Sequence, residues 1–249
     1  MKSTILGVGV DAISFDEARA KAIGFLDGDK PAMIFTPNPE MIMAARKNSA
    51  FRDILNSADM VVPDGIGVVL ASKLGRVKIK ERVTGCDLVL ALFDAIKDTG
   101  YSVYFFGSKP GIAEKAKAAI EEKFPGIKIV GTSDGYYDEE KEKRIIEDIR
   151  AKNPGLVLVG TGMVKQETWI AENRDKLGAK LLIGVGGCLD VFCGHVTRAP
   201  RAMRRLGLEW LYRLIREPKR LKRQIYIPLF ALLVLRERFS PRSGHTILP

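Results

Sequence analysis

From residue 102 onward the sequence alternates between short apolar runs and longer amphipathic stretches, and this alternation constrains the fold more than any other feature. The apolar runs lie at 102–106, 128–130, 156–159 and 180–185, and segments with helical spacing lie at 112–123, 139–152 and 167–173. Strands that alternate with helices are typical of parallel sheets, because a parallel pair needs a crossover connection. We therefore predict an α/β fold, a Rossmann-like and mostly parallel sheet flanked by helices, for a domain of residues 1–197.

Two earlier turns place polar side chains directly after apolar runs. The run Ala32–Phe35 stops at Thr36-Pro37-Asn38-Pro39-Glu40, and Met60-Val61-Val62 stops at Pro63-Asp64-Gly65. Proline removes an N–H donor and biases the residue before it toward extended backbone, so each turn reads as a strand end followed by a helix. Ligands bind at the carboxyl edge of open α/β sheets. The pattern favours a site containing Thr36, Asn38 and Asp64, with two ordinary turns as the alternative.

Three later runs end in glycine, at Gly107-Ser108, Gly160-Thr161-Gly162 and Gly186-Gly187. Glycine allows the backbone to approach a ligand closely, and the helix N-termini that follow offer N–H groups to phosphate. Neither the Gly-x-Gly-x-x-Gly nor the Walker pattern is present. The three turns therefore predict that the sheet edge binds a nucleotide or a nucleotide sugar, without identifying which.

The positive charge is concentrated in the last fifth of the chain. The net charge is +10, yet residues 1–197 hold 27 Lys and Arg against 27 Asp and Glu, whereas residues 198–249 hold 13 against three. Arg213, Arg216, Arg220 and Arg223 follow helical spacing and share one face. We predict a basic amphipathic helical appendage at 198–239 and a disordered tail at 240–249.

The appendage also carries an apolar run at 225–235, interrupted by Pro228. This run is too short to span a bilayer, but it can lie in the interface beside anionic lipid. An alternative is packing against the domain or against a second subunit in a homo-oligomer. Nucleic acid is the less favoured partner, because the apolar residues form aliphatic runs rather than isolated stacking aromatics. We therefore expect an anionic membrane surface as the partner and no nucleic acid.

Cysteine and histidine usage predicts neither disulfides nor a metal centre. Cys86, Cys188 and Cys193 form no Cys-x-x-Cys pair, which suits a reducing cytosol, and no signal-peptide pattern opens the chain. The two histidines, His195 and His245, have no partner at metal-ligand spacing. We expect no cofactor and an activity that survives EDTA.

Six motifs taken together resemble the WecG/TagA/CpsF glycosyltransferase family over residues 5–235. They are Phe35-Thr36-Pro37-Asn38-Pro39-Glu40, Pro63-Asp64-Gly65-Ile66-Gly67, Arg82-Val83-Thr84-Gly85-Cys86-Asp87, Phe106-Gly107-Ser108, Gly160-Thr161-Gly162 through Gln166-Glu167, and Gly186-Gly187-Cys188-Leu189-Asp190. Within the family, the likeness is to the N-acetylmannosaminyltransferases of wall teichoic acid linkage-unit synthesis. The resemblance implies inverting transfer of ManNAc from UDP-ManNAc to GlcNAc-diphospho-undecaprenol, by a peripheral protein on the cytoplasmic face of the membrane.

The resemblance, joined to the chemistry of a single displacement, suggests a role for each candidate residue. Asp64 would be the general base, and Thr36 and Asn38 would orient sugar or acceptor hydroxyls. The remaining assignments are Gln166 and Arg82 for the diphosphate, Asp190 with Gly186 and Gly187 for the ribose, Gly107, Ser108, Gly160 and Gly162 for close approach of the donor, Tyr136 for uracil, and Arg213, Arg220 and Arg223 for the membrane or the lipid diphosphate.

Three alternatives stay open on the sequence. Another donor, UDP-ManNAc uronate or UDP-glucose, is compatible with the same motifs. A non-catalytic nucleotide-binding module that docks on membrane or nucleic acid would have no need of the Asp64 carboxylate. A nicotinamide-dependent oxidoreductase would be expected to carry the glycine fingerprint that this chain lacks.

Overall fold

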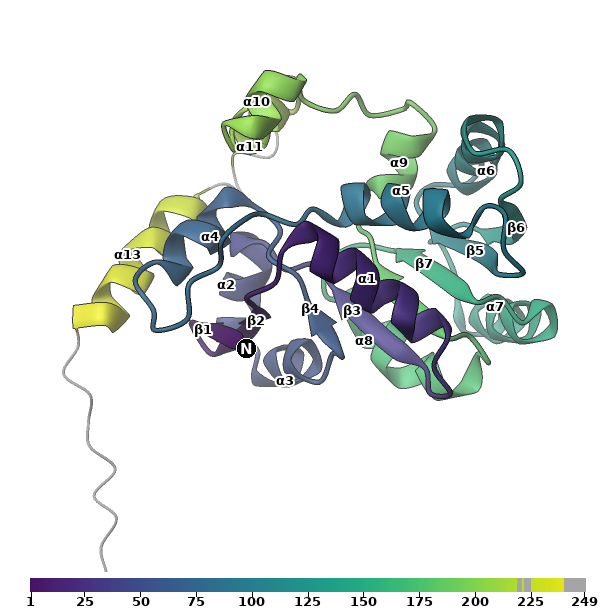
Figure 1. Cartoon of the computed structure of the whole chain (residues 1–249), viewed down its shortest axis with the longest axis horizontal. Helices are drawn as coiled ribbons and strands as arrows, with labels where there is room; N and C mark the ends of the chain where they lie inside the picture. The colour runs from purple at the N-terminus through teal and green to yellow at the C-terminus, as the bar shows by residue number, and fades with distance from the viewer. Residues whose placement is uncertain (219–220, 222–224, 240–249) are drawn as a thin grey trace, which may run out of the picture.

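The computed structural model describes residues 1–218, 221 and 225–239, and its centre is a six-stranded parallel sheet (Figure 1). The strands are β3 (Ala32–Phe35), β4 (Met60–Val61), β5 (Ser102–Gly107), β6 (Lys128–Ser133), β7 (Leu156–Gly160) and β8 (Leu181–Gly184). Their order across the sheet is β4-β3-β8-β7-β5-β6. All five pairings are parallel, so the carboxyl ends of the strands meet at one edge. The predicted Rossmann-like fold is confirmed.

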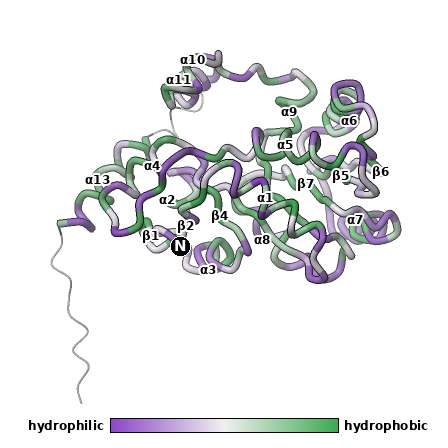
Figure 2. The backbone as a smooth tube through the Cα atoms, viewed as in Figure 1, coloured by the Kyte–Doolittle hydropathy of each residue, from purple (hydrophilic) through white to green (hydrophobic). Residues whose placement is uncertain are grey.

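Helices cover both faces of the sheet. One face carries α2 (Pro39–Lys47), α3 (Ser49–Asn56), α7 (Glu139–Lys152) and α8 (Lys165–Asn173), and the other carries α1 (Phe15–Leu26), α5 (Gly85–Ile96), α6 (Ile112–Lys123) and α9 (Cys188–Phe192). Alternate residues of each strand join the core on either face: in β5, Tyr104 and Phe106 pack on the first side and Val103 and Phe105 on the second. Both faces are thus buried, which explains why the strands read as continuous apolar runs. The hydrophobic colouring of the central strands in Figure 2 shows the same pattern.

The sheet has a switch point between β5 and β7. These two strands pair side by side, yet α6 follows β5 on one face and α8 follows β7 on the other. The helices diverge where the strand order reverses, and in open α/β sheets ligands bind at such a point. Two of the three glycine turns lie at this switch point, and the third follows β8, the neighbour of β7.

Polar side chains cap several of the helices. Ser14 caps α1, Asn38 caps α2, Thr84 caps α5 and Asp138 caps α7, each accepting a hydrogen bond from a backbone N–H in the first turn. The capping fixes where each helix begins, so the residues just before α2 and α5 have a defined position at the sheet edge.

The N-terminus forms a separate two-stranded hairpin rather than part of the main sheet. Strands β1 (Lys2–Ile5) and β2 (Val8–Asp11) pair antiparallel around a turn at Leu6 and Gly7, both of which have positive φ. Residues 1–11 contribute no strand to the parallel sheet. The hairpin packs instead beside α3 and α4 (Ile66–Ser72).

The segment after residue 197 turns back over the carboxyl edge. It contains α10 (Arg201–Arg205), α11 (Glu209–Arg216) and α13 (Tyr226–Phe239), and α13 lies along α2 and α4 (Figure 1). Phe230 and Val234 of α13 are buried in the core of the domain, so part of the segment packs on the domain as the alternative interpretation had it. The predicted tail at 240–249 lies outside the described residues. Nowhere in the described part of the chain does a helix reach the length and apolarity that crossing a membrane requires.

The expectation of no disulfide is wrong. Cys86 and Cys188 are joined by a disulfide, with their Cα atoms 5.6 Å apart and a sequence separation of 102 positions, and Cys193 is free. This pairing could not be predicted from the sequence, because the two cysteines share no motif. They meet because α5 and α9 both begin at the carboxyl edge on the same face of the sheet. The bond therefore ties together two segments of the predicted site.

Candidate active site

Backbone hydrogen bonds join the two proline-containing turns. The N–H of Asp64 donates to the carbonyl of Pro37 (3.3 Å), and the N–H of Val83 donates to the carbonyl of Pro63 (3.0 Å). The first bond continues the ladder between β3 and β4 beyond the strands, and the second adds the segment before α5. The N–H of Gly85, at the start of α5, donates to the Asp64 carboxylate. Three chain segments thus converge on one carboxylate.

Thr36 and Asn38 flank this carboxylate in different ways. The Thr36 hydroxyl donates to the carbonyl of Gly184 (3.4 Å), and the side chain is buried directly behind Gly85. The Asn38 side chain accepts the N–H of Met41 (3.0 Å) as the cap of α2 and also lines the cavity in front of Asp64. In this structure Thr36 positions the sheet edge from behind, whereas Asn38 faces the space that a ligand can occupy.

That space is a cavity of about 540 Å³ between the domain and the appendage. Its polar end is lined by Asn38, Glu40, Asp64, Arg82, Thr84, Arg198, Glu209 and Arg213, and its other end by apolar side chains of α4 and α13. The volume lies in the range of sites that enclose small molecules. The cavity is therefore the candidate active site, and residues before and after position 198 build it together.

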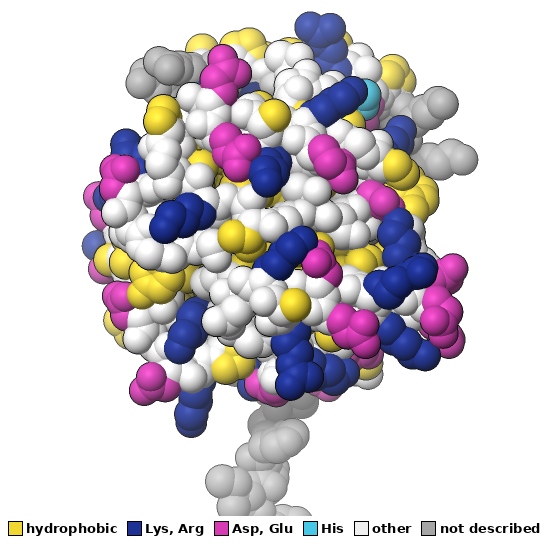
Figure 3. Space-filling view, turned by 90° about the vertical axis from the view of Figure 1, so that its right-hand side faces the viewer, with side chains coloured by type: hydrophobic (Ala, Val, Ile, Leu, Met, Phe, Trp, Pro, Cys, Tyr) yellow, Lys and Arg dark blue, Asp and Glu magenta, His cyan; other side chains and the backbone are white. Residues whose placement is uncertain are grey.

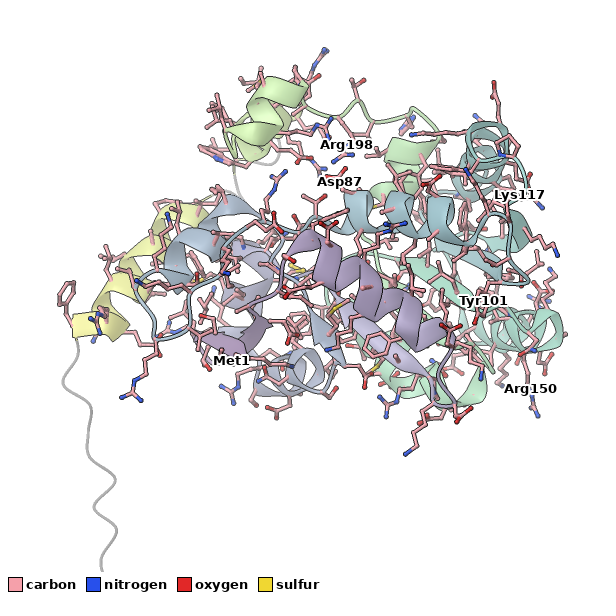
Figure 4. The ribbon with its side chains drawn as sticks, in the orientation of Figure 1. Met1, Asp87, Tyr101, Lys117, Arg150 and Arg198 are labelled. Carbon is pink, nitrogen blue, oxygen red and sulfur yellow. A yellow bond between two sulfur atoms is a disulfide. The ribbon has the colours of Figure 1, made fainter. Side chains whose placement is uncertain are left out.

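Two groups of ion pairs connect the appendage to the domain. Glu209 of α11 lies 3.5 Å from Arg82 and 2.9 Å from Arg213. Arg198 donates two parallel hydrogen bonds to Asp87 of α5 (2.7 and 3.0 Å), and the two side chains face each other in Figure 4. A forked pair of this type fixes geometry as well as charge. The polar end of the cavity thus gathers three arginines opposite Asp64.

Asp64 has the protonation behaviour that a general base requires. Burial raises the pKa of its carboxyl to about 6, while Arg82 and Arg213 act to lower the pKa and Glu209 acts to raise it. The group is therefore ionised at neutral pH but holds a proton more firmly than an exposed aspartate, which suits proton abstraction from a hydroxyl. Asp87 differs: burial acts against ionisation, but the hydrogen bonds from Arg198 and Thr84 lower its pKa on balance. Of the two carboxylates, Asp64 is the better base.

The glycine-rich end of the sheet edge is held by close backbone contacts. Gly107 has φ 139°, and a Cβ there would lie 2.4 Å from the carbonyl carbon of Gly160, so no other residue fits. The N–H of Ser108 donates to the carbonyl of Gly160 (2.9 Å), and its hydroxyl donates to Asp190 (2.8 Å). The structure thus brings Ser108 and Asp190 together at the switch point, where a nucleotide is expected.

Gln166 links two of the glycine turns. Its side-chain carbonyl accepts the N–H of Gly186 (3.0 Å), and its amide donates to Glu167, which in turn accepts the N–H of Val164 (2.7 Å). Val164 has φ 72°, a backbone conformation that needs such support. Gln166 and Glu167 are buried, and burial raises the pKa of Glu167 to about 7. The predicted diphosphate ligand Gln166 is therefore engaged in shaping the loops of this structure.

The remaining predicted residues have fewer contacts with the rest of the site. Tyr136 follows β6 and is 63% exposed, and its N–H donates to Asp134 (2.9 Å). Gly162 and Gly187 are exposed on the glycine turns, and Gly186 is partly exposed. Arg220 and Arg223 lie outside the described residues.

From the sequence, Asp87 is part of a family motif and the carboxylate to test as base after Asp64, whereas Arg198 and Glu209 have no individual site role. Glu209 carried a signal, since it is one of three acids in a segment with 13 cations. Its partner Arg213 is four positions along the same helix, so helical spacing alone brings the two together. Its partner Arg82 is 127 positions away, so that pairing depends on the fold. The Arg198–Asp87 pair had no comparable signal, because each residue reads alone as an ordinary surface charge.

In the described residues, no group of three or more His, Cys, Asp or Glu side chains is arranged to hold a metal ion. The cations that face the cavity come from arginine side chains. Arginine presents several donors in a planar fork and binds phosphate well. These residues can meet the negative charge of a diphosphate directly.

Fold and site together define a Rossmann-like class of protein in which the switch point of the parallel sheet adjoins a cavity lined by a carboxylate and several arginines. The chain belongs to the Glycosyl transferase WecG/TagA/CpsF family, which it matches over residues 3–244. It is 38% identical over 223 residues to the N-acetylglucosaminyldiphosphoundecaprenol N-acetyl-beta-D-mannosaminyltransferase of Bacillus spizizenii, covering 89% of this chain and 86% of that protein. The protein of the same name from Bacillus subtilis strain 168 is also 38% identical, over 219 residues, with 88% and 85% covered.

These matches confirm the family predicted from the six motifs. Membership of a glycosyltransferase family makes this chain an enzyme, and it sets aside the non-catalytic module and the nicotinamide-dependent oxidoreductase. Both relatives are named as mannosaminyltransferases, which bears on the choice of donor sugar taken up below.

Proposed function

We propose that this protein is an inverting glycosyltransferase that transfers N-acetylmannosamine from UDP-ManNAc to GlcNAc-diphospho-undecaprenol, in the linkage unit of wall teichoic acid. The observation that carries the proposal is the position of Asp64, a carboxylate with a raised pKa facing Arg82 and Arg213 in a cavity beside the switch point of the sheet. The names of the two relatives support ManNAc as the sugar over ManNAc uronate or glucose.

The mechanism follows from one displacement. Asp64 takes the proton of the acceptor hydroxyl as the oxygen forms a bond to the anomeric carbon, and the bond between that carbon and the UDP oxygen breaks. UDP leaves with the electron pair. Arg82, Arg198 and Arg213 are positioned at the polar end of the cavity to stabilise the negative charge that develops. Attack opposite the leaving group gives inversion.

The donor fits the glycine-rich end of the edge. Gly107 and Gly160 are buried against each other, whereas Gly162 and Gly187 on the following turns are exposed. Ser108 and Asp190 offer a hydroxyl and a carboxylate at the same edge. β8 lies between β7 and β3 in the sheet, so a donor that starts at the switch point has its sugar directed toward Asn38 and Asp64. The acceptor then enters from the side of the appendage.

The appendage supports a peripheral position at the cytoplasmic face of the membrane. Leu229, Leu232 and Phe239 share one face of α13 and are 40%, 62% and 79% exposed. In sequence, the segment 198–249 to which α13 belongs holds 13 Lys and Arg. Apolar side chains and cations are the two components of interfacial binding. At the opposite end of the molecule, acidic and basic side chains are interspersed (Figure 3).

The test is an assay of transfer from UDP-ManNAc to a short-chain GlcNAc-diphospholipid. The release of UDP and the mass of the product are the two readouts. General base catalysis contributes about 10²–10⁴-fold, so Asp64→Asn should lower turnover by that factor and change UDP affinity little. Asp53→Asn is the matched control, since that carboxylate is 74% exposed on α3 and should have normal activity. Near-normal turnover of Asp64→Asn would remove Asp64 from the mechanism, and Asp87→Asn would then be tested next.

A further inference from the structure

The apolar end of the cavity has no role in binding a nucleotide sugar. Its walls are Leu70 of α4, Leu74 just beyond α4, and Ile227, Ala231 and Leu235 of α13. A nucleotide sugar and an acetylated amino sugar carry polar groups along their whole length. Hydrocarbon walls would leave such groups without hydrogen-bond partners. These walls therefore call for a ligand with a hydrocarbon part.

The cavity is continuous from its cationic end to this hydrocarbon end. Asp64, Arg82 and Arg213 line the same 540 Å³ space as Leu74 and Ala231. A diphosphate joined directly to a branched hydrocarbon chain has the same order of chemistry along its length. Charge complementarity at one end thus fixes which end of such a ligand lies against the apolar walls.

The hydrocarbon end also opens to the exterior. Leu70 and Leu235 line the cavity and are 51% and 43% exposed, and Ala231 between the two helices is exposed as well. Phe230 and Val234, on the adjoining side of α13, are buried in the core and anchor the helix against the domain. The walls therefore form a groove with a fixed base and an open mouth, through which a long chain can leave the protein.

We infer that the groove between α4 and α13 binds the first isoprene units of the acceptor lipid, next to its diphosphate. The inference rests on the proposed function and adds a direct protein subsite for the hydrocarbon. The subsite acts without a bilayer: each methylene buried there strengthens binding by about fourfold. It makes the enzyme select for an isoprenyl diphosphate over a diphosphate with no chain.

The test compares two probes without vesicles or detergent, methyl diphosphate and geranyl diphosphate, by titration calorimetry. The wild-type protein should bind geranyl diphosphate at least about tenfold more tightly than methyl diphosphate. Ala231→Trp fills the groove and Ala231→Asp places a charge in it, so both should abolish that preference and keep the affinity for methyl diphosphate. Ala151→Trp, the same change at an exposed alanine of α7, should keep the preference.

Each outcome decides the matter. Equal affinity of the wild-type protein for both probes would contradict the proposal that the groove binds the hydrocarbon chain. An unchanged preference for geranyl diphosphate in both Ala231 variants would contradict it as well. Loss of the preference in Ala151→Trp would overturn it too, because the effect would then not depend on the groove. The retained methyl diphosphate affinity shows that the variants are folded. The binding assay needs no sugar transfer, so failure of the proposed reaction would show separately, as no product from any UDP-sugar.

Discussion

The two regions that build the cavity are held in different ways. The domain side is fixed by parallel strands, capped helices, a disulfide and close glycine contacts, and its core side chains are almost fully buried. The appendage side is held by Arg198–Asp87, Arg82–Glu209, the two buried side chains of α13 and the contact of Gly207 with Ile66. The proposed base lies on the firmly held side, whereas Arg198 and Arg213 lie on the other.

This difference shows which residues of the proposed site depend on the appendage. The proposed base Asp64 and Arg82 belong to residues 1–197, whereas Arg198 and Arg213 belong to the appendage. The ion pairs between the two regions are largely shielded from solvent: the side chains of Arg82, Glu209 and Arg198 are only 16%, 14% and 17% exposed. We expect that the docked appendage completes the proposed site.

The largest effect is expected from removing the appendage. A protein ending at residue 197 should lose transfer activity and binding to anionic vesicles, because the cavity loses one wall and its arginines. It should stay folded and bind UDP, since the donor end belongs to β5, β7 and β8. The measurements are product formation, vesicle co-sedimentation and UDP titration. Arg213, Arg220 and Arg223 changed together to Glu should weaken vesicle binding less completely, and high salt should imitate that change.

Two results would contradict this picture of the appendage. The truncated protein could still co-sediment with anionic vesicles, which would place the membrane contact on the domain. The intact protein could instead bind DNA in preference to vesicles at equal salt, which would make the basic segment a nucleic-acid element.

A smaller effect is expected from a change of pH. It tests the domain side of the cavity, because Asp64 belongs to that side. Proton abstraction needs ionised Asp64, so kcat/KM should fall about tenfold per pH unit below its pKa of about 6. The same raised pKa predicts a stability effect: the folded state holds this proton more tightly than the unfolded state. The resulting stabilisation is complete below the unfolded pKa and is lost as pH rises through 6.

The control for this profile is Glu167, the other carboxyl with a pKa raised by burial, to about 7. Glu167→Gln should keep the fall in kcat/KM near pH 6. If that fall disappeared in Glu167→Gln, the titration would belong to Glu167, and the assignment to Asp64 would be wrong.

The smallest effect is expected from Glu209→Gln, which changes only the ion pairs between the two regions. Glu209 pairs with Arg82 and Arg213, so its removal should free both cations and lower KM for the acceptor. We expect a decrease of about fivefold, which corresponds to an interaction of about 1 kcal/mol. The substitution should also shift the pH profile slightly to lower pH, since Glu209 acts to raise the pKa of Asp64. Glu140→Gln, 80% exposed on α7, is the matched control. A raised KM would show that Glu209 holds the arginines in place rather than competing for them.

The sequence alone determined the sheet, the helices and the turns that carry Thr36, Asn38, Asp64 and the glycines. These features depend on local patterns, namely apolar runs, proline and glycine positions, and caps such as Thr84, and neighbours in sequence fix them. Helices 112–123 and 139–152 were predicted with the bounds that the structure shows. The hairpin at residues 1–11 was not predicted, because its turn at Leu6 carries no typical turn residue before Gly7.

Only the tertiary structure decided which distant groups meet. The disulfide between Cys86 and Cys188, the Arg198–Asp87 pair and the Arg82–Glu209 pair each join residues more than 100 positions apart. No local pattern encodes such pairings, because they depend on strand order and on the path by which the appendage returns over the carboxyl edge. The raised pKa of Asp64 has the same origin, since burial by remote segments determines it. A single sequence states which side chains are available, and the fold decides which of them share one cavity.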